Sequence, residues 1–203
     1  GGKDPGTIHR HQLNGQMVQV VEKEIVLDVS MRVYALLQER FPEIRVLFTR
    51  DDDTFVVLED RPRMANAALP IEPDVMLLIS IHANAAPRRQ PYGFEVWVLP
   101  KEHERDLLSS RTGEHGDNDT RPILNAMLDE QISRESVVLA SRILDGLEGR
   151  VGAQTKNRGL FEESWAVVRH ARMPAVLVEL GFVTNPTEAQ LLTQPGYLSL
   201  LAH

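Results

Sequence analysis

The chain has 203 residues, enough for one domain with a sizeable core, and its 42% apolar and 25% charged residues are those of an ordinary globular protein. A net charge of −7 argues against general binding to nucleic acid or anionic lipid, because a phosphate-binding surface normally carries a cationic excess. Cysteine is absent, so disulfides and cysteine-based zinc sites are excluded, and any metal must be held by histidine and carboxylate.

The first third of the chain predicts two helices and one short strand. Apolar residues recur at helical spacing over about residues 21–40, so we expect a helix there with Glu22 in its first turn. Residues 46–48 predict a short strand. A second helix is expected over 58–68, where Pro62 is tolerated only in the first turn.

Two strands are expected in the middle of the chain. Residues 75–81 form a continuous apolar run, which is typical of a strand covered on both faces, and His82 and Asn84 follow it. Residues 93–99 predict a second strand.

Residues 100–133 form an insertion that is longer than most connections in compact domains, which makes it either functional or mobile. It is polar and without a clear period up to about residue 121, whereas residues 123–132 indicate a short amphipathic helix. A separate helix is expected over residues 137–147.

The end of the chain predicts a short strand at 166–168, a buried strand at 175–178 and a closing helix over 188–201 that is broken near Pro195. No apolar run is long enough to cross a bilayer, so membrane insertion is not expected.

A lone carboxylate, Glu179, closes the apolar run at 175–178. An unpaired buried carboxylate is costly, so Glu179 needs a cation, a donor network or a raised pKa, and each of these marks a functional site. The alternative is that Glu179 accepts backbone N–H bonds from the turn at Gly181 and only anchors that turn. The residues of this stretch leave both interpretations open.

Strands that alternate with helices predict a single α/β domain with a mainly parallel sheet flanked by helices. Ligands of such sheets bind beyond the carboxyl ends of the strands. His82 follows one predicted strand and Glu179 closes another, so we expect the two side chains to converge at one edge.

Six segments, taken in order, match the pattern of a known family. They are Gly1-Gly-Lys-Asp-Pro-Gly6, Glu22-Lys-Glu-Ile-Val-Leu27, Thr49-Arg50-Asp51, Ser80-Ile-His-Ala-Asn84, Gly93-Phe-Glu-Val96 and Leu177-Val-Glu-Leu-Gly-Phe-Val-Thr-Asn-Pro186. Together they resemble the zinc-dependent N-acetylmuramoyl-L-alanine amidases. The resemblance covers nearly the whole chain and implies an α/β sheet of about six strands. It also implies hydrolysis of the amide that joins muramic acid to the stem peptide of peptidoglycan.

Carried over position by position, the resemblance implies that Glu22 and His82 are zinc ligands and that Glu179 is the catalytic acid/base. Zinc held by such oxygen and nitrogen donors keeps a position for water, lowers the pKa of that water towards about 7 and polarises the scissile carbonyl. Glu179 would then pass a proton from the water to the leaving amine. Each residue also has a structural alternative, since a helix dipole favours a carboxylate at Glu22 and a histidine after a strand is often a turn residue.

The family's third zinc ligand is a histidine that would stand just before Gly1. The resemblance therefore implies that residues 1–203 are an amidase catalytic domain truncated at its N terminus, and also at its C terminus. With two ligands the affinity for zinc is expected to be weak. Asn84 is a candidate substrate-binding residue, and a turn-forming asparagine is the alternative.

By position, the insertion at 100–133 resembles the regulatory segment of some cell-separation amidases, which covers the zinc until an activator protein withdraws it. Glu102, Glu104 and Glu114 are candidates for the carboxylate that closes the site. The alternative is a flexible surface loop.

Peptidoglycan as substrate implies work in the periplasm or cell envelope, in wall remodelling or daughter-cell separation. Two other functions remain open. The chain could be a non-catalytic module that binds peptidoglycan or a partner, or a zinc peptidase that cuts within the stem peptide.

Overall fold

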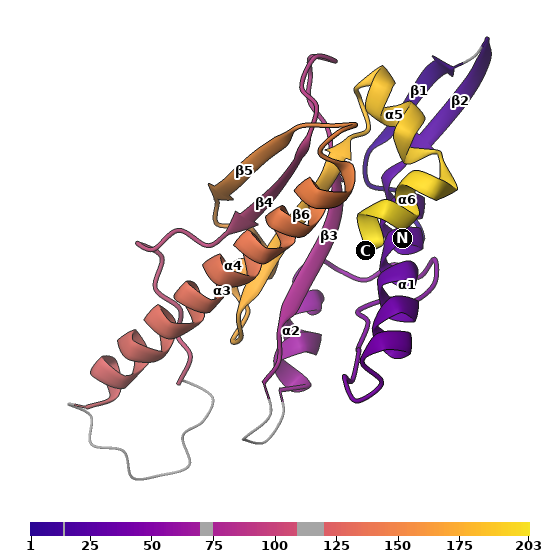
Figure 1. Cartoon of the computed structure of the whole chain (residues 1–203). Coiled ribbons are helices and arrows are strands. Elements are labelled where there is room, and N and C mark those ends of the chain that lie inside the picture. The colour runs from indigo at the N-terminus through magenta and orange to yellow at the C-terminus, as the bar shows by residue number, and fades with distance from the viewer. Residues whose placement is uncertain (14, 70–74, 109–119) are drawn as a thin grey trace.

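The computed structural model describes residues 1–13, 15–69, 75–108 and 120–203. Its elements are β1 (Ile8–Leu13), β2 (Gln16–Val21), α1 (Glu22–Arg40), α2 (Asp60–Ala67), β3 (Leu78–Asn84), β4 (Phe94–Val98), α3 (Arg121–Val151), β5 (Asn157–Glu162), α4 (Ala166–Arg169), β6 (Ala175–Phe182), α5 (Pro186–Leu192) and α6 (Pro195–Ala202). β1 and β2 form a hairpin of their own, and the other four strands form one sheet in the order β3-β6-β4-β5 (Figure 1).

The central sheet is mixed. β3 runs parallel to β6 and β4 runs parallel to β5, whereas β4 and β6 are antiparallel. The predicted α/β domain with helices on a mainly parallel sheet is therefore confirmed, with four strands in the central sheet of the described chain.

Apolar side chains cover both faces of this sheet. One face packs against α1, α3, α5 and α6 through a cluster that includes Val176 and Val178 of β6. The opposite face packs against α2 and α4 through a second cluster that includes Ala175 and Leu177. Because side chains alternate along a strand, Glu179 belongs to the series of Ala175 and Leu177 and projects from the second face.

The strongest sequence patterns give the correct elements. The predicted helix at 21–40 is α1, whose first turn carries Glu22 and Glu24 and whose last turn carries Arg40, as the helix dipole favours. The predicted closing helix is broken at Pro195 into α5 and α6.

Three local predictions are wrong. Residues 46–48 form no strand, and the Phe48 ring packs edge-on against Tyr34 with the centroids 5.4 Å apart. Residues 166–168 lie in a single helical turn, since the N–H groups of Val168 and Arg169 donate to the Trp165 carbonyl oxygen. The two helices expected over 123–147 are one continuous helix, α3, because no glycine or proline separates them.

The predicted strand at 75–81 is β3, shifted to Leu78–Asn84, and it lies at an edge of the sheet. It is not covered on both faces, because Val75, Leu77 and Ile79 are 80%, 49% and 44% exposed. The hairpin and β5 were not predicted, since β1 and β5 are largely polar and none of the three strands shows a regular apolar–polar alternation. Among the described residues, no helix is both long and apolar enough to span a bilayer.

Candidate active site

Three polar side chains form a row across the sheet. His82 on β3 is opposite Glu179 on β6, and Glu179 is in turn opposite Glu95 on β4. Directly opposed residues of neighbouring strands project to the same face, so all three side chains share the face that also carries α2 and α4. The predicted convergence of His82 and Glu179 is confirmed, although Glu179 lies within β6 rather than at its end.

Glu22 reaches this row from the first residue of α1. Its Oε1 lies 3.2 Å from His82 Nδ1, and its Oε2 accepts a hydrogen bond of 2.8 Å from the Thr7 N–H. Burial alone would raise the pKa of Glu22, but the hydrogen bonds from His82 and Thr7 outweigh it and lower the pKa. Glu22 is therefore held ionised next to an imidazole nitrogen.

The approach of the chain to Glu22 depends on a glycine. Gly6 has φ +66°, and a Cβ atom there would collide with the Glu22 carboxylate. The position therefore requires glycine both for its left-handed backbone and for space. This explains on physical grounds why Gly6 belongs to the first of the matching segments.

His82 is fixed through both ring nitrogens. Nδ1 faces Glu22, and Nε2 lies 3.0 Å from the hydroxyl of Ser80, which is two residues earlier on the same face of β3. A partner on the second nitrogen sets the orientation of the ring and makes the first nitrogen available as a ligand. The sequence analysis did not assign this role to Ser80.

Glu22 and His82 are a chemically suitable pair of zinc donors. A carboxylate oxygen and an imidazole nitrogen already face one another, in an arrangement that a divalent cation could bridge. In the described part of the chain, no third histidine, aspartate or glutamate joins them in a group that could hold a metal. The donor set thus fits two of the three positions that the resemblance implies.

Glu179 is half-buried beside this pair. Its Oε2 is buried and has no hydrogen-bond partner within the described ranges. Burial, and then the charges of Glu22 and Glu95, raise the pKa of Glu179 to about 9. A carboxylate with these properties is a candidate for proton transfer.

The alternative role for Glu179, anchoring the turn at Gly181, belongs to a different residue. Glu188 on α5 is 3% exposed, and its carboxylate accepts from the Phe182 N–H at 2.7 Å and from the Gly93 N–H at 2.9 Å. The hydroxyl of Thr155 also donates to it. Glu188 therefore ties the end of β6 to the start of β4, and Glu179 is not needed for this.

Glu95 was missed by the sequence analysis. It is 1% exposed and accepts from Arg158 Nε at 2.5 Å, from Asn84 Nδ2 at 2.7 Å and from Trp97 Nε1 at 3.1 Å. A carboxylate inside a predicted strand was the available signal, as it was for Glu179. Asn84 also accepts from the Ala85 N–H through Oδ1 at 2.7 Å, so it both shapes the turn and holds Glu95.

Of the candidate regulatory carboxylates, Glu102 and Glu104 are not brought to this row. Glu102 and Glu104 are exposed and follow the end of β4, and Glu114 lies outside the described residues. Because β4 runs antiparallel to β6, the end of β4 lies beside the start of β6, away from Glu179. Their regulatory role stays a prediction.

A profile of the N-acetylmuramoyl-L-alanine amidase family matches residues 1–203. The chain belongs to this family. It is 32% identical over 202 residues to the endolysin of Bacillus phage SPP1, with 100% of this chain and 59% of the endolysin covered. It is 27% identical over 218 residues to the amidase AmiA of Salmonella typhimurium, with 100% of this chain and 69% of AmiA covered. The chain thus spans about three fifths of the endolysin.

The structure resembles solved amidases of the same family. The N-acetylmuramoyl-L-alanine amidase from Clostridium difficile 630 superposes with a TM-score of 0.69 at 26% identity, covering 100% of this chain and 86% of that one. The family is zinc-dependent and its members act on peptidoglycan.

Proposed function

We propose that this chain hydrolyses the amide between N-acetylmuramic acid and L-alanine of the peptidoglycan stem peptide, with one zinc ion as cofactor. Glu22 and His82 would hold the zinc, and Glu179 would be the catalytic acid/base. The observation that carries the proposal is the convergence of Glu22 and His82 at 3.2 Å beside Glu179, whose buried Oε2 has no hydrogen-bond partner among the described residues.

Each residue of the site would have a separate role in the reaction. Zinc bound by Glu22 and His82 would polarise the amide carbonyl, acidify a water molecule and favour the ionised form of Glu179. Glu179 Oε2, to which no described residue is hydrogen-bonded, would accept the proton of the attacking water and donate it to the leaving amine nitrogen. The Thr7 N–H and the Ser80 hydroxyl would keep Glu22 and His82 in position.

Identification of the bond that is cut tests this proposal. Zinc-loaded protein is incubated with purified peptidoglycan, and the products are identified by mass spectrometry beside those of Glu179→Ala. Intact stem peptides with a free N-terminal alanine, absent with the variant, are expected. Cleavage within the stem would indicate the peptidase instead, and no release by zinc-bound protein would indicate the binding module.

Asn84, which borders the row, is a candidate contact for the substrate.

Peptidoglycan lies outside the cytoplasmic membrane, so this activity places the protein in the periplasm or cell envelope. Its role there would be wall remodelling or the separation of daughter cells. The relatives named above are an endolysin and an N-acetylmuramoyl-L-alanine amidase.

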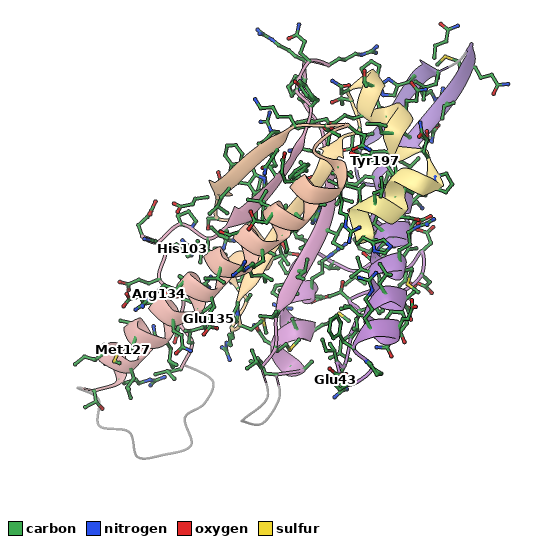
Figure 2. All side chains as sticks on the ribbon, viewed as in Figure 1. Glu43, His103, Met127, Arg134, Glu135 and Tyr197 are labelled. Carbon is green, nitrogen blue, oxygen red and sulfur yellow. The ribbon has the colours of Figure 1, made fainter. Side chains whose placement is uncertain are left out.

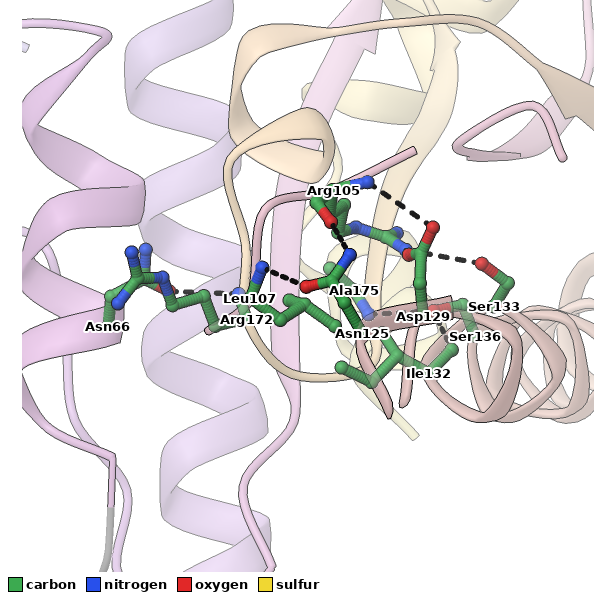
Figure 3. A network of polar contacts seen from close by, with 10 residues as sticks. All are labelled: Asn66, Arg105, Leu107, Asn125, Asp129, Ile132, Ser133, Ser136, Arg172 and Ala175. Carbon is green, nitrogen blue, oxygen red and sulfur yellow. Dashed lines mark hydrogen bonds and ion pairs between the residues drawn. The ribbon is translucent and has the colours of Figure 1, made fainter. Parts of the chain in front are cut away.

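We further propose that the insertion at 100–133 regulates access to the zinc and is the contact point of an activator protein. Part of it is anchored, because buried Arg105 donates to Asp129 at 2.5 Å and to Ser133 at 3.1 Å, while the Asn125 side chain bonds the backbone of Arg105 and Leu107 (Figure 3). This network joins the segment after β4 to the N-terminal half of α3.

The same half of α3 exposes apolar side chains that suit a protein partner. They are Ile123, Leu124 and Met127, which are 63%, 52% and 62% exposed, and Met127 lies near the N-terminal end of the helix (Figure 2). A solved relative with 20% identity, the CwlD amidase of Clostridioides difficile, is in complex with the GerS lipoprotein. The closing group would be a carboxylate of the insertion, with Glu102, Glu104 and Glu114 as candidates.

Deletion of residues 101–120 tests the gate. A faster release of stem peptides than from the intact chain is expected, and an unchanged or slower release by a variant that still binds zinc would contradict it. A double substitution of Leu124 and Met127 by serine should leave basal hydrolysis unchanged and remove only activation by a partner.

A further inference from the structure

Both tryptophans of the chain lie in one aromatic group on the face of the sheet that carries α2 and α4. Trp97 of β4 stacks on Phe161 of β5 with centroids 4.9 Å apart and an interplanar angle of 29°. Trp165, in the turn before α4, meets Trp97 edge-on at 6.1 Å and 87°. Trp165 is 46% exposed, so this aromatic platform of Trp97, Phe161 and Trp165 presents an indole ring to solvent.

The platform adjoins the row of His82, Glu179 and Glu95. Trp97 is two residues after Glu95 on β4, and Phe161 is directly opposite Trp97, so both rings project from the face that carries Glu179. Trp97 Nε1 donates to Glu95 Oε1 at 3.1 Å. A molecule whose reacting bond lies over Glu179 would therefore extend over these rings if it continued across β4 towards β5.

The platform is preorganised. The indole of Trp97 is held by Glu95, whose position is fixed by Arg158 and Asn84. The Trp165 backbone is fixed by a tight turn, in which its N–H donates to the Glu163 carbonyl oxygen and its own carbonyl oxygen accepts from the N–H groups of Val168 and Arg169. A ring that is already ordered loses little conformational entropy when a ligand binds, which favours affinity.

We propose that the aromatic platform binds a pyranose ring of the peptidoglycan glycan strand and so positions the muramoyl side of the substrate. This inference rests on the proposed amidase function. A pyranose presents a face of polarised C–H groups that complements the negative face of an indole ring, and its hydroxyls can donate to nearby carboxylates.

The charges around the platform favour a neutral sugar over the stem peptide. Glu162 and Glu163 are exposed beside Trp165, and the charge of Arg158 is already offset by the buried Glu95. Stem peptides carry free carboxylates, which this negative border would repel. The stem peptide would then leave the row on the side away from β5.

Intrinsic fluorescence tests the platform directly, because the chain has no tryptophan outside it. The protein is titrated with a soluble tetramer of N-acetylglucosamine and, separately, with free stem peptide. The sugar is expected to change the tryptophan emission saturably, and the peptide is not. In Trp165→Ala, the dissociation constant read from Trp97 should rise about tenfold, equivalent to about 1.4 kcal/mol.

Two further variants control for folding. Trp165→Phe keeps an aromatic ring and should recover most of the affinity, whereas Phe41→Ala removes a 48% exposed ring at the far end of α1 and should change nothing. Circular dichroism confirms that each variant is folded. A response to stem peptide but not to sugar, or equal sugar binding by folded Trp165→Ala, overturns the proposal.

Hydrolysis separates this inference from the function on which it rests. With polymeric peptidoglycan, Trp165→Ala should raise KM several-fold at nearly unchanged kcat, since the ring binds substrate but moves no proton. Saturable sugar binding by a protein that releases no stem peptide would support the platform and contradict the amidase. Hydrolysis with unchanged KM in Trp165→Ala would support the amidase and contradict the platform.

Discussion

Glu22 Oε1 and His82 Nδ1 lie 3.2 Å apart although 60 positions separate the two residues in the chain. One begins α1 and the other lies in β3, so the packing of α1 beside the edge of the sheet brings them together. The contact is a carboxylate–imidazole pair that zinc could bridge. Substitutions can separate the contribution of this pair to zinc affinity from that of neighbouring charges.

Removal of either donor should abolish zinc binding at this site. We expect Glu22→Gln and His82→Ala each to weaken zinc more than about a hundredfold, because a site with few protein donors has none to spare. Zinc affinity is measured by competition with a chromophoric chelator. Glu24→Gln, an exposed carboxylate in the same helical turn, is the matched control and should bind zinc like the parent chain. Equal losses in all three variants would mean that general charge, not ligation, holds the metal.

Gly6→Ala should disturb the zinc site through the Glu22 carboxylate. Two positions with positive φ allow the effect to be isolated, since a Cβ at Gly6 would collide with Glu22 whereas a Cβ at Gly15, with φ +82°, would meet nothing within 4 Å. Both alanine variants carry a backbone cost of about 1 kcal/mol. Only Gly6→Ala should also lose zinc affinity and unfold at clearly lower urea concentration. Indistinguishable behaviour of the two variants would contradict the close approach of Gly6 to Glu22.

Glu179→Gln should lose hydrolytic activity and should make the metal-free protein more stable. The variant is expected to lose hydrolysis because an amide cannot carry the proton. In the absence of metal it should unfold at higher urea, because the parent chain buries a carboxyl group whose pKa is raised from 4.5 to about 9. The folded parent keeps its proton where the unfolded chain has lost it, so parent stability falls as pH rises from 4.5 to 9.

The free energy of unfolding of Glu179→Gln should therefore exceed that of the parent by a difference that grows by about 2 kcal/mol from pH 6 to pH 8 in the presence of a chelator. Urea unfolding at the two pH values measures it. A difference that is constant or narrows with pH would show that Glu179 is not held in the environment described.

Glu188→Gln should have the opposite effect on stability. Its carboxylate accepts from two backbone N–H groups and a hydroxyl in a buried site, and an amide cannot accept all three bonds without placing its own N–H groups against donors. A loss of about 2–3 kcal/mol is expected. Thermal unfolding compared with Glu179→Gln checks this, and a variant as stable as the parent would contradict the anchoring role.

The parts of the fold that could be predicted are those with strong local patterns. α1 has a clear helical apolar period and was predicted at about 21–40, close to its actual bounds. β6 begins with a continuous apolar run, and this first half of the strand, 175–178, was predicted. The hairpin of β1 and β2 could not be predicted, because neither strand shows a regular apolar–polar alternation. Buried His11 of β1 bonds the Val183 carbonyl oxygen at 2.8 Å. That contact spans most of the chain and leaves no local signal.

The site shows the same division. Glu179 was found from the cost of burying a carboxylate in a strand, a rule that needs no partner. The pairing of Glu22 with His82 was expected only through the resemblance to the amidases, since no local pattern encodes the packing of α1 against β3. The same rule applied to Glu95, which was nevertheless missed. Its partners Asn84 on β3 and Arg158 on β5 are brought to it only by the folded sheet.

Glu22 and His82 are proposed to hold zinc beside Glu179. Crystals grown with zinc can test this by anomalous diffraction at the zinc edge. The account predicts one strong anomalous peak at about 2.0–2.2 Å from an oxygen of Glu22 and a nitrogen of His82, with Glu179 close by but not bonded to the metal. A peak at other residues only, with Glu22 still hydrogen-bonded directly to His82, would contradict it.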